Sequence, residues 1–175
     1  MALDAAIYAT GAKQGVFKGS NPFKTRPNSS IVSQVTHLID IPKDPASGLS
    51  LGKRVHHPLN VIIPLDAASV QWWTAAVNNE TLTKVKVDFF QPVTQGLTQN
   101  QAAGSGGEAK AHFTIELTNA VVSSIELYHP DTRSQDPDIK HREITIKLSL
   151  TYATIDSTWA NGGLVFHDAW TEGSQ

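Results

Sequence analysis

A strict alternation of apolar and polar residues constrains the fold of this chain more than any other feature. Between Glu143 and Tyr152 every even-numbered residue is apolar, and every odd-numbered residue is polar or charged. Successive side chains of a β-strand point to opposite faces, so this period of two predicts a strand with one dry and one wet face. It is the clearest strand of the sequence.

The same alternation recurs in two earlier stretches. Over residues 84–90 it places Val85, Val87 and Phe89 on one face, and Pro92 then ends the strand because proline lacks an amide donor. Over residues 112–128 the alternation is longer than a strand usually runs. The length predicts a bend or a β-bulge near Asn119 and Ala120.

Three further segments, residues 30–41, 59–63 and 163–170, have the composition of strands. The last follows a turn over residues 161–163. These strands predict a mainly β fold.

The only good helix signal covers residues 66–78. Asp66 is the expected N-cap, and Leu65 and Val70 occupy the hydrophobic-staple positions. Val70, Trp73 and Val77 recur at helical spacing and are expected to face the core.

Length and composition exclude several classes of protein. The 175 residues suit one domain, which can bury roughly 70% of the surface of its unfolded chain without disulfides or a structural metal. The absence of cysteine excludes thiolate zinc sites, iron–sulfur clusters and cysteine nucleophiles. A formal charge of −2 without a dense basic cluster argues against nucleic acid as a partner. We expect no signal peptide and no insertion into a membrane.

No group of residues has the spacing of a catalytic or metal site. His56 and His57 would point to opposite faces of a strand, which does not favour a shared metal ion. Residues 48–54 lack both the spacing and the Ser/Thr of a phosphate-binding loop, and the acidic segment 131–138 lacks the pattern of an EF-hand. The sequence therefore predicts no catalytic residue, no cofactor and no metal.

Several stretches together resemble the haemolysin-coregulated protein (Hcp) family, which forms the inner tube of the type VI secretion system. Ser157 departs from the family pattern, because many members have an aromatic residue there. The stretches that carry the resemblance are Phe17-Lys18-Gly19-Ser20, Pro64-Leu65-Asp66 before Trp72-Trp73, residues 117–125 with Val122-Ser123-Ser124, residues 143–158, and Gly162-Gly163 to Trp170.

The resemblance implies a single β-barrel of two packed antiparallel sheets with one short helix, spanning residues 1–175. It implies homohexameric rings that stack into a hollow tube, which is expelled with its spike protein by a contractile sheath. Effector proteins would travel in the lumen, and the subunit would have no active site. The protein would be made in the cytoplasm of a Gram-negative bacterium and secreted by the type VI machinery.

The long connection between Pro42 and Pro58 is the predicted ring-stacking loop, since ring-to-ring contacts should be weaker than the contacts that close a ring. Residues 96–109 are expected to form a mobile loop. The polar residues expected to reach a neighbouring ring are Lys43, Asp44, Lys53, Arg54, His56 and His57.

The adjacent pair Trp72 and Trp73 cannot both face a narrow core, because neighbouring helical residues point about 100° apart. One ring should pack inward and the other should lie at a rim. Core packing and a contact between protomers both remain open for Trp72.

Two alternative functions fit a mainly β chain of this size. One is a monomeric β-barrel that binds a small molecule in its interior. The other is a tail-tube subunit of a phage-like particle, which would share the physics of assembly.

Overall fold

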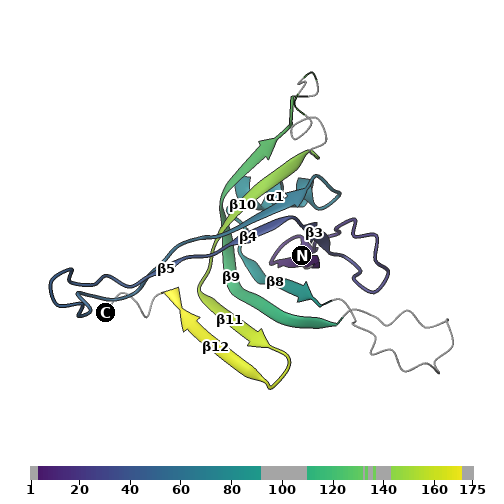
Figure 1. Cartoon of the computed structure of the whole chain (residues 1–175). Helices are drawn as coiled ribbons and strands as arrows, with labels where there is room; N and C mark the ends of the chain where they lie inside the picture. Colours follow the sequence, from purple (N-terminus) through teal and green to yellow (C-terminus); the bar gives the residue numbers. More distant parts are fainter. Residues whose placement is uncertain (1–3, 92–109, 132, 134–135, 137–142, 171–175) are drawn as a thin grey trace, which may run out of the picture.

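The computed structural model describes residues 4–91, 110–131, 133, 136 and 143–170. The predicted mobile loop 96–109 lies outside the described residues, as does most of 130–142. Antiparallel strands and one helix form the described part of the chain (Figure 1). The elements are β1 (Asp4–Gly11), β2 (Gly15–Val16), β3 (Ser30–Val32), β4 (Gln34–Thr36), β5 (Ile39–Asp40), β6 (Val55–His56), β7 (Leu59–Pro64), α1 (Ser69–Val77), β8 (Leu82–Phe90), β9 (Ala111–Tyr128), β10 (Thr145–Thr151), β11 (Thr154–Trp159) and β12 (Leu164–Ala169).

The long strand β9 organises the sheets because it pairs with three other strands. Its first part lies between β8 and β11, and its second part pairs with β10. The change of partner falls at Asn119, whose φ of 49° is in the left-handed region. The predicted bend near Asn119 and Ala120 is therefore confirmed, and asparagine suits it because it tolerates this conformation better than most residues.

Hydrogen-bonded pairing follows an open path from β2 through β1, β8, β9, β10 and β7 to β4. The remaining strands branch from this path: β3 pairs with β1, and β11 pairs with β9 and β12. The mainly β fold with one short helix is confirmed. The pairing does not trace a closed barrel, so the predicted closure is not established.

The core lies on the inner faces of the two halves of this sheet. In β10 the side chains of Ile146, Leu148 and Leu150 are fully buried, as the alternation predicts. Val85 and Val87 of β8 are equally buried. Together with side chains of β1, β7, β9 and β11 they form one apolar cluster, which α1 also joins.

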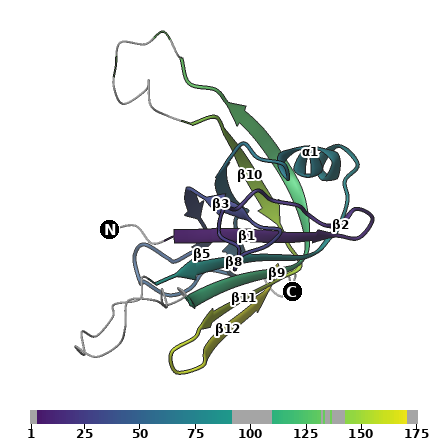
Figure 2. The same ribbon diagram turned by 90° about the vertical axis from the view of Figure 1, so that its right-hand side faces the viewer.

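Helix α1 lies against β9 (Figure 2), but it buries a different face from the predicted one. Val70 and Val77 are 68% and 83% exposed, and the core-facing residues are Ala68, Trp72 and Ala75. The two small alanines let the helix backbone approach the sheet closely. Trp72 then fills the remaining space, with its ring centroid 4.9 Å from that of Phe17 in an edge-to-face contact.

The predicted start of the helix also needs correction. Leu65 and Val70 are both exposed, so they form no hydrophobic staple. Asp66 does not cap the helix through its side chain. Its Oδ2 instead accepts hydrogen bonds from Ser20 N at 3.1 Å and Ser30 Oγ at 2.5 Å, which tie the segment before the helix to the loop after β2 and to the start of β3.

The hairpin of β11 and β12 forms one edge of the sheet and extends beyond the core (Figure 1). Gly162 and Gly163 both have positive φ in the turn between the strands, as the sequence predicts for residues 161–163. Within the described residues β12 pairs only with β11. Leu164, Val165 and Phe166 are exposed, which leaves an apolar strand edge without cover.

Replacing Ile146 with aspartate should prevent stable folding. The side chain is fully buried, so the substitution places an unpaired carboxylate in the core and costs more than about 3 kcal/mol. Urea denaturation followed by circular dichroism measures the loss. Lys147→Asp on the exposed face of the same strand is the matched control and should keep most of the stability. Equal stability of the two variants would contradict the assignment of the faces.

Candidate functional site

The connection between β4 and β7 projects from the sheets as a narrow hairpin, which we call the arm and define as residues 37–57 (Figure 1). Near its base, β5 and β6 pair through Ile39 with His56 and Asp40 with Val55. Further out, Lys43 and Ser50 form an isolated bridge. The arm therefore has a regular antiparallel geometry over part of its length.

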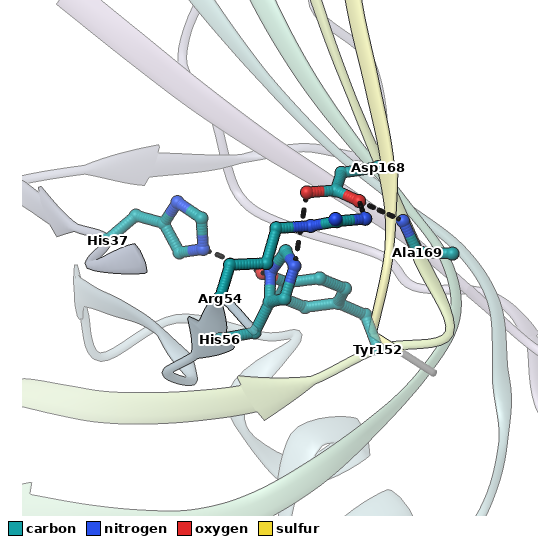
Figure 3. Close-up of polar contacts among 6 residues, drawn as sticks. All are labelled: His37, Arg54, His56, Tyr152, Asp168 and Ala169. Carbon is teal, nitrogen blue, oxygen red and sulfur yellow. Dashed lines mark hydrogen bonds and ion pairs between the residues drawn. The ribbon is translucent and has the colours of Figure 1, made fainter. Parts of the chain in front are cut away.

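A buried polar network anchors the base of the arm to the C-terminal strands (Figure 3). The hydroxyl of Tyr152, between β10 and β11, lies 2.7 Å from Nε2 of His37 and 3.0 Å from Nδ1 of His56. His56 Nε2 lies 3.2 Å from Oδ2 of Asp168 on β12, a close approach without hydrogen-bond alignment. The guanidinium of Arg54 donates a hydrogen bond to the other carboxylate oxygen of Asp168. We call these five residues the latch.

The geometry assigns the protons of the latch. His56 Nε2 faces a carboxylate, which favours the tautomer with the proton on Nε2 and leaves Nδ1 as an acceptor. Tyr152 consequently donates its single proton to His56, and His37 Nε2–H donates to the phenol oxygen. In this arrangement the two imidazole rings and the phenol hydroxyl form one continuous chain of hydrogen bonds.

The charges of the latch follow from its burial. Burial opposes the ionisation of Asp168, but the hydrogen bonds from Arg54 and from the Ala169 N–H outweigh it and hold the pKa of this carboxyl below its usual range. Burial, reinforced by the charge of Asp168, raises the pKa of Tyr152 to about 12. Burial also lowers the pKa of His37, with smaller contributions from His56 and His57.

Trp170 packs against two rings of the network. The ring of Trp170 stacks on His56 at a centroid distance of 5.7 Å and meets Tyr152 edge-on at 5.1 Å. These contacts cover the rings of His56 and Tyr152 on the side of Trp170. The latch therefore fixes the arm to β12 and to the junction of β10 and β11.

The structure separates the predicted stacking residues into two groups. Lys43, Asp44 and Lys53 lie on the outer part of the arm, where Asp44 accepts hydrogen bonds from Ala46 N and Ser47 Oγ in its own turn.

Arg54, His56 and His57 lie at the base of the arm. His57 is half-exposed and lies 2.8 Å from Asp40. His56 is buried in the latch and Arg54 is engaged with Asp168, so neither side chain points freely away from the subunit, and their stacking role stays a prediction.

A contact of Trp72 with another protomer is not supported by its position. The residue is 1% exposed and packs against Phe17, whereas Trp73 is only partly buried. Core packing is therefore the role of Trp72, and Trp73 is the ring at the rim.

The chemistry of the latch is structural. Its polar groups bind one another, and within the described ranges no cluster of three His, Cys, Asp or Glu side chains is suited to a metal ion. No helix of the described part is long and apolar enough to cross a membrane.

Sequence analysis did not find the latch because its members are far apart along the chain. Tyr152 is 96 residues from His56 and 115 from His37. Tyr152 appears in the sequence as one more apolar residue of an alternating strand, and Asp168 as one acid near the C-terminus. Only the pairing of β11 with β12 brings them together.

Tyr152→Phe should lower the free energy of unfolding by about 1–3 kcal/mol, because it leaves two histidine nitrogens without their buried partner. The substitution should also change how the free energy of unfolding depends on pH in the alkaline range. A neutral phenol stabilises the fold fully below about pH 10, and this contribution is lost as the pH rises toward the folded pKa of about 12. Urea titrations at several pH values measure both effects. Tyr128→Phe, at a half-exposed ring, is the control and should change neither.

His37 should make the fold less stable in mild acid. Its pKa is lowered in the folded state, so the stability it contributes is present above the unfolded value of 6.5 and is lost as the pH falls through the folded pKa. The melting temperature should fall between pH 7 and pH 5, and less so in His37→Gln. An identical decline in both proteins would show that His37 does not titrate in this way.

Comparison with known proteins identifies the family. The family model described as "Type VI secretion system effector, Hcp" matches residues 9–159. The "Major exported protein" of Pseudomonas aeruginosa is 27% identical over 179 residues, which cover 97% of this chain and 96% of that protein.

Solved structures share the fold. A crystal structure of an Hcp protein has a TM-score of 0.79 at 23% identity, covering 97% of this chain and 98% of the other. Hcp1 from Escherichia coli has a TM-score of 0.77 at 21% identity, covering 97% and 99%. Because the family model spans most of the sequence, the chain belongs to the Hcp family, whose members are structural tube subunits of the type VI secretion system and not enzymes.

Proposed function

We propose that this chain assembles into homohexameric rings and that the rings stack into the hollow inner tube of a type VI secretion system. The observation that carries the proposal is the family match over residues 9–159. Homologous tube subunits do their work by assembly, and a closed ring needs two different patches that fit each other on adjacent copies.

The exposed edge of β12 supports a ring contact. Leu164, Val165 and Phe166 present an apolar edge, and the strand pairs on one side only within the described residues. Pairing with an adjacent copy would cover the side chains and satisfy the backbone groups of this edge.

We propose that each subunit is a single domain over residues 1–175, closed as a barrel by residues 30–36. This segment pairs with β1 through β3 and with β7 through β4. Between the two strands, Ser33 N donates a hydrogen bond to Ile62 O at 2.8 Å. Residues 30–36 would thus connect the sheet at β1 to the sheet at β7 and complete the barrel wall.

The outer face of β4, β7, β10 and β9 is our candidate for the lumen wall. Its side chains include a row formed by Thr36, Asn60, Ser149 and Ser124, in which Ser149 Oγ donates to Asn60 Oδ1 at 2.6 Å. Short polar side chains would hold varied cargo weakly. In this role the tube would be made in the cytoplasm of a Gram-negative bacterium, enclosed by a sheath and tipped by a spike protein, and would carry effectors out.

The outer arm residues Lys43, Asp44 and Lys53, with His57 at the base, remain our proposed stacking residues. They lie on the element that extends furthest from the sheets in Figure 1. Arg54 and His56 would act indirectly by holding the arm in place through the latch.

Light scattering on a sizing column tests the ring directly. The wild-type chain should elute as particles of about six times its 18.9 kDa, with ring-shaped images in negative stain. Val165→Glu should shift the mass toward that of a single chain, because it places a charge in the proposed contact. Lys24→Glu, exposed in the loop before β3, is the control for charge and should leave rings intact. A monomeric wild-type protein would contradict the proposal.

A further inference from the structure

The arm carries more exposed aliphatic surface than its polar sequence suggests. Five large aliphatic side chains on it are between 48% and 70% exposed. An isolated two-stranded hairpin is only marginally stable in water, and apolar groups gain free energy when they are covered. These residues are Leu38, Ile41, Leu49, Leu51 and Val55.

The latch makes the arm a prepared binding element. Arg54 and His56 are tied to Asp168, while His37 is tied to Tyr152, so both strands of the arm are fixed at its base. About eight residues lead from this base to the tip, which gives a reach of up to roughly 25 Å at the rise of a β-strand. Fixing the arm before binding lowers the entropy lost on binding.

A groove of about 470 Å³ lies on the outer face of β7, β9 and β10, at one end of the face that we propose as the lumen wall, where the next ring would adjoin it. Ile62 and Tyr128 give it apolar walls, and Glu126, Glu143 and Lys147 surround them. This volume is within the range of pockets that take up side chains or small ligands. The groove therefore combines apolar walls with a surround of net negative charge.

The arm and the groove lie at opposite ends of the same strands. The arm leaves the sheet where Leu59 pairs with Leu150, whereas the groove lies toward the end where Pro64 pairs with Thr145 and Thr145 with Tyr128. A contact between two different patches joins copies head to tail, and because these two lie at opposite ends of the strands, it can continue from copy to copy along the strand direction. That is the geometry a stack of rings requires.

The two patches are also complementary in charge and polarity. The outer arm carries Lys43 and Lys53 against the single Asp44, whose carboxylate is already engaged within its own turn. The groove offers Glu126 and Glu143 against the single Lys147. A positive arm with exposed leucines thus meets a negative groove with apolar walls.

We propose that the arm of one copy inserts into this groove on a copy in the next ring, with its aliphatic side chains on Ile62 and Tyr128 and its lysines near Glu126 and Glu143. The contact rests on the proposed stacking of rings and names the surface that receives the arm. It differs from a purely polar loop contact because the leucines would contribute most of the buried apolar surface.

A charge-swap experiment tests the contact. One variant carries Lys43→Glu and Lys53→Glu in the arm, a second carries Glu126→Lys and Glu143→Lys in the groove, and a third carries all four changes. Sedimentation and negative stain measure ring mass and the fraction of stacked rings. Each double variant should need a roughly tenfold higher protein concentration to stack, the effect of two exposed ion pairs, and the combined variant should recover.

The apolar part of the contact has its own variant and control. Leu49→Asp with Leu51→Asp should abolish stacking while the ring mass and the melting temperature stay unchanged, because both residues are exposed in the single chain. Lys24→Glu should stack as the wild type does.

The readouts separate failure of the contact from failure of the proposed function. Rings that stack equally well with both charge variants, or a combined variant that does not recover, would overturn the arm-in-groove contact but leave the rings standing. Wild-type protein that forms no rings would contradict the proposed function. In that case the contact would be tested on association between single chains, which each charge variant should weaken and the combined variant should restore.

Discussion

The bend of β9 at Asn119 is the constraint on which the rest of the structure depends. One continuous strand must serve both halves of the sheet, and it can do so only if it turns where its partner changes from β11 to β10. The left-handed φ at Asn119 supplies this turn. The opposite strand follows the same course, because Tyr152 and Ala153 separate β10 from β11. The apolar cluster fills the concave side that the bend creates.

The latch depends on that bend. Tyr152 lies where β10 passes into β11, so the change of sheet that shapes the fold also delivers a buried hydroxyl to the base of the arm. Asp168 arrives from β12, whose only strand partner in the described residues is β11. A chain that misplaced the bend would therefore lose the support of its most extended segment.

The parts predicted well from sequence are those where local pattern and burial agree. Alternation placed β8, β9 and β10, because a strand with one buried face leaves its period in the sequence, and the length of the alternating run predicted the bend of β9. The buried face of the helix was predicted wrongly. Its valines look apolar enough to face inward, but the space beneath α1 admits alanine and one tryptophan, and that depends on β9. The latch could not be predicted, since contacts between residues about 100 positions apart leave no pattern in the local sequence.

The uncovered edge of β12 has a consequence for the chain before assembly. An apolar strand edge without a partner can pair with any other extended segment. Each newly folded copy can therefore either assemble with another folded copy or aggregate with an unfolded one. In the proposed ring an adjacent folded copy would cover this edge, whereas pairing with an unfolded chain would lead to aggregation. For the proposed ring, the yield of assembled subunits would therefore depend on how fast folded copies associate relative to aggregation, as well as on the stability of the fold.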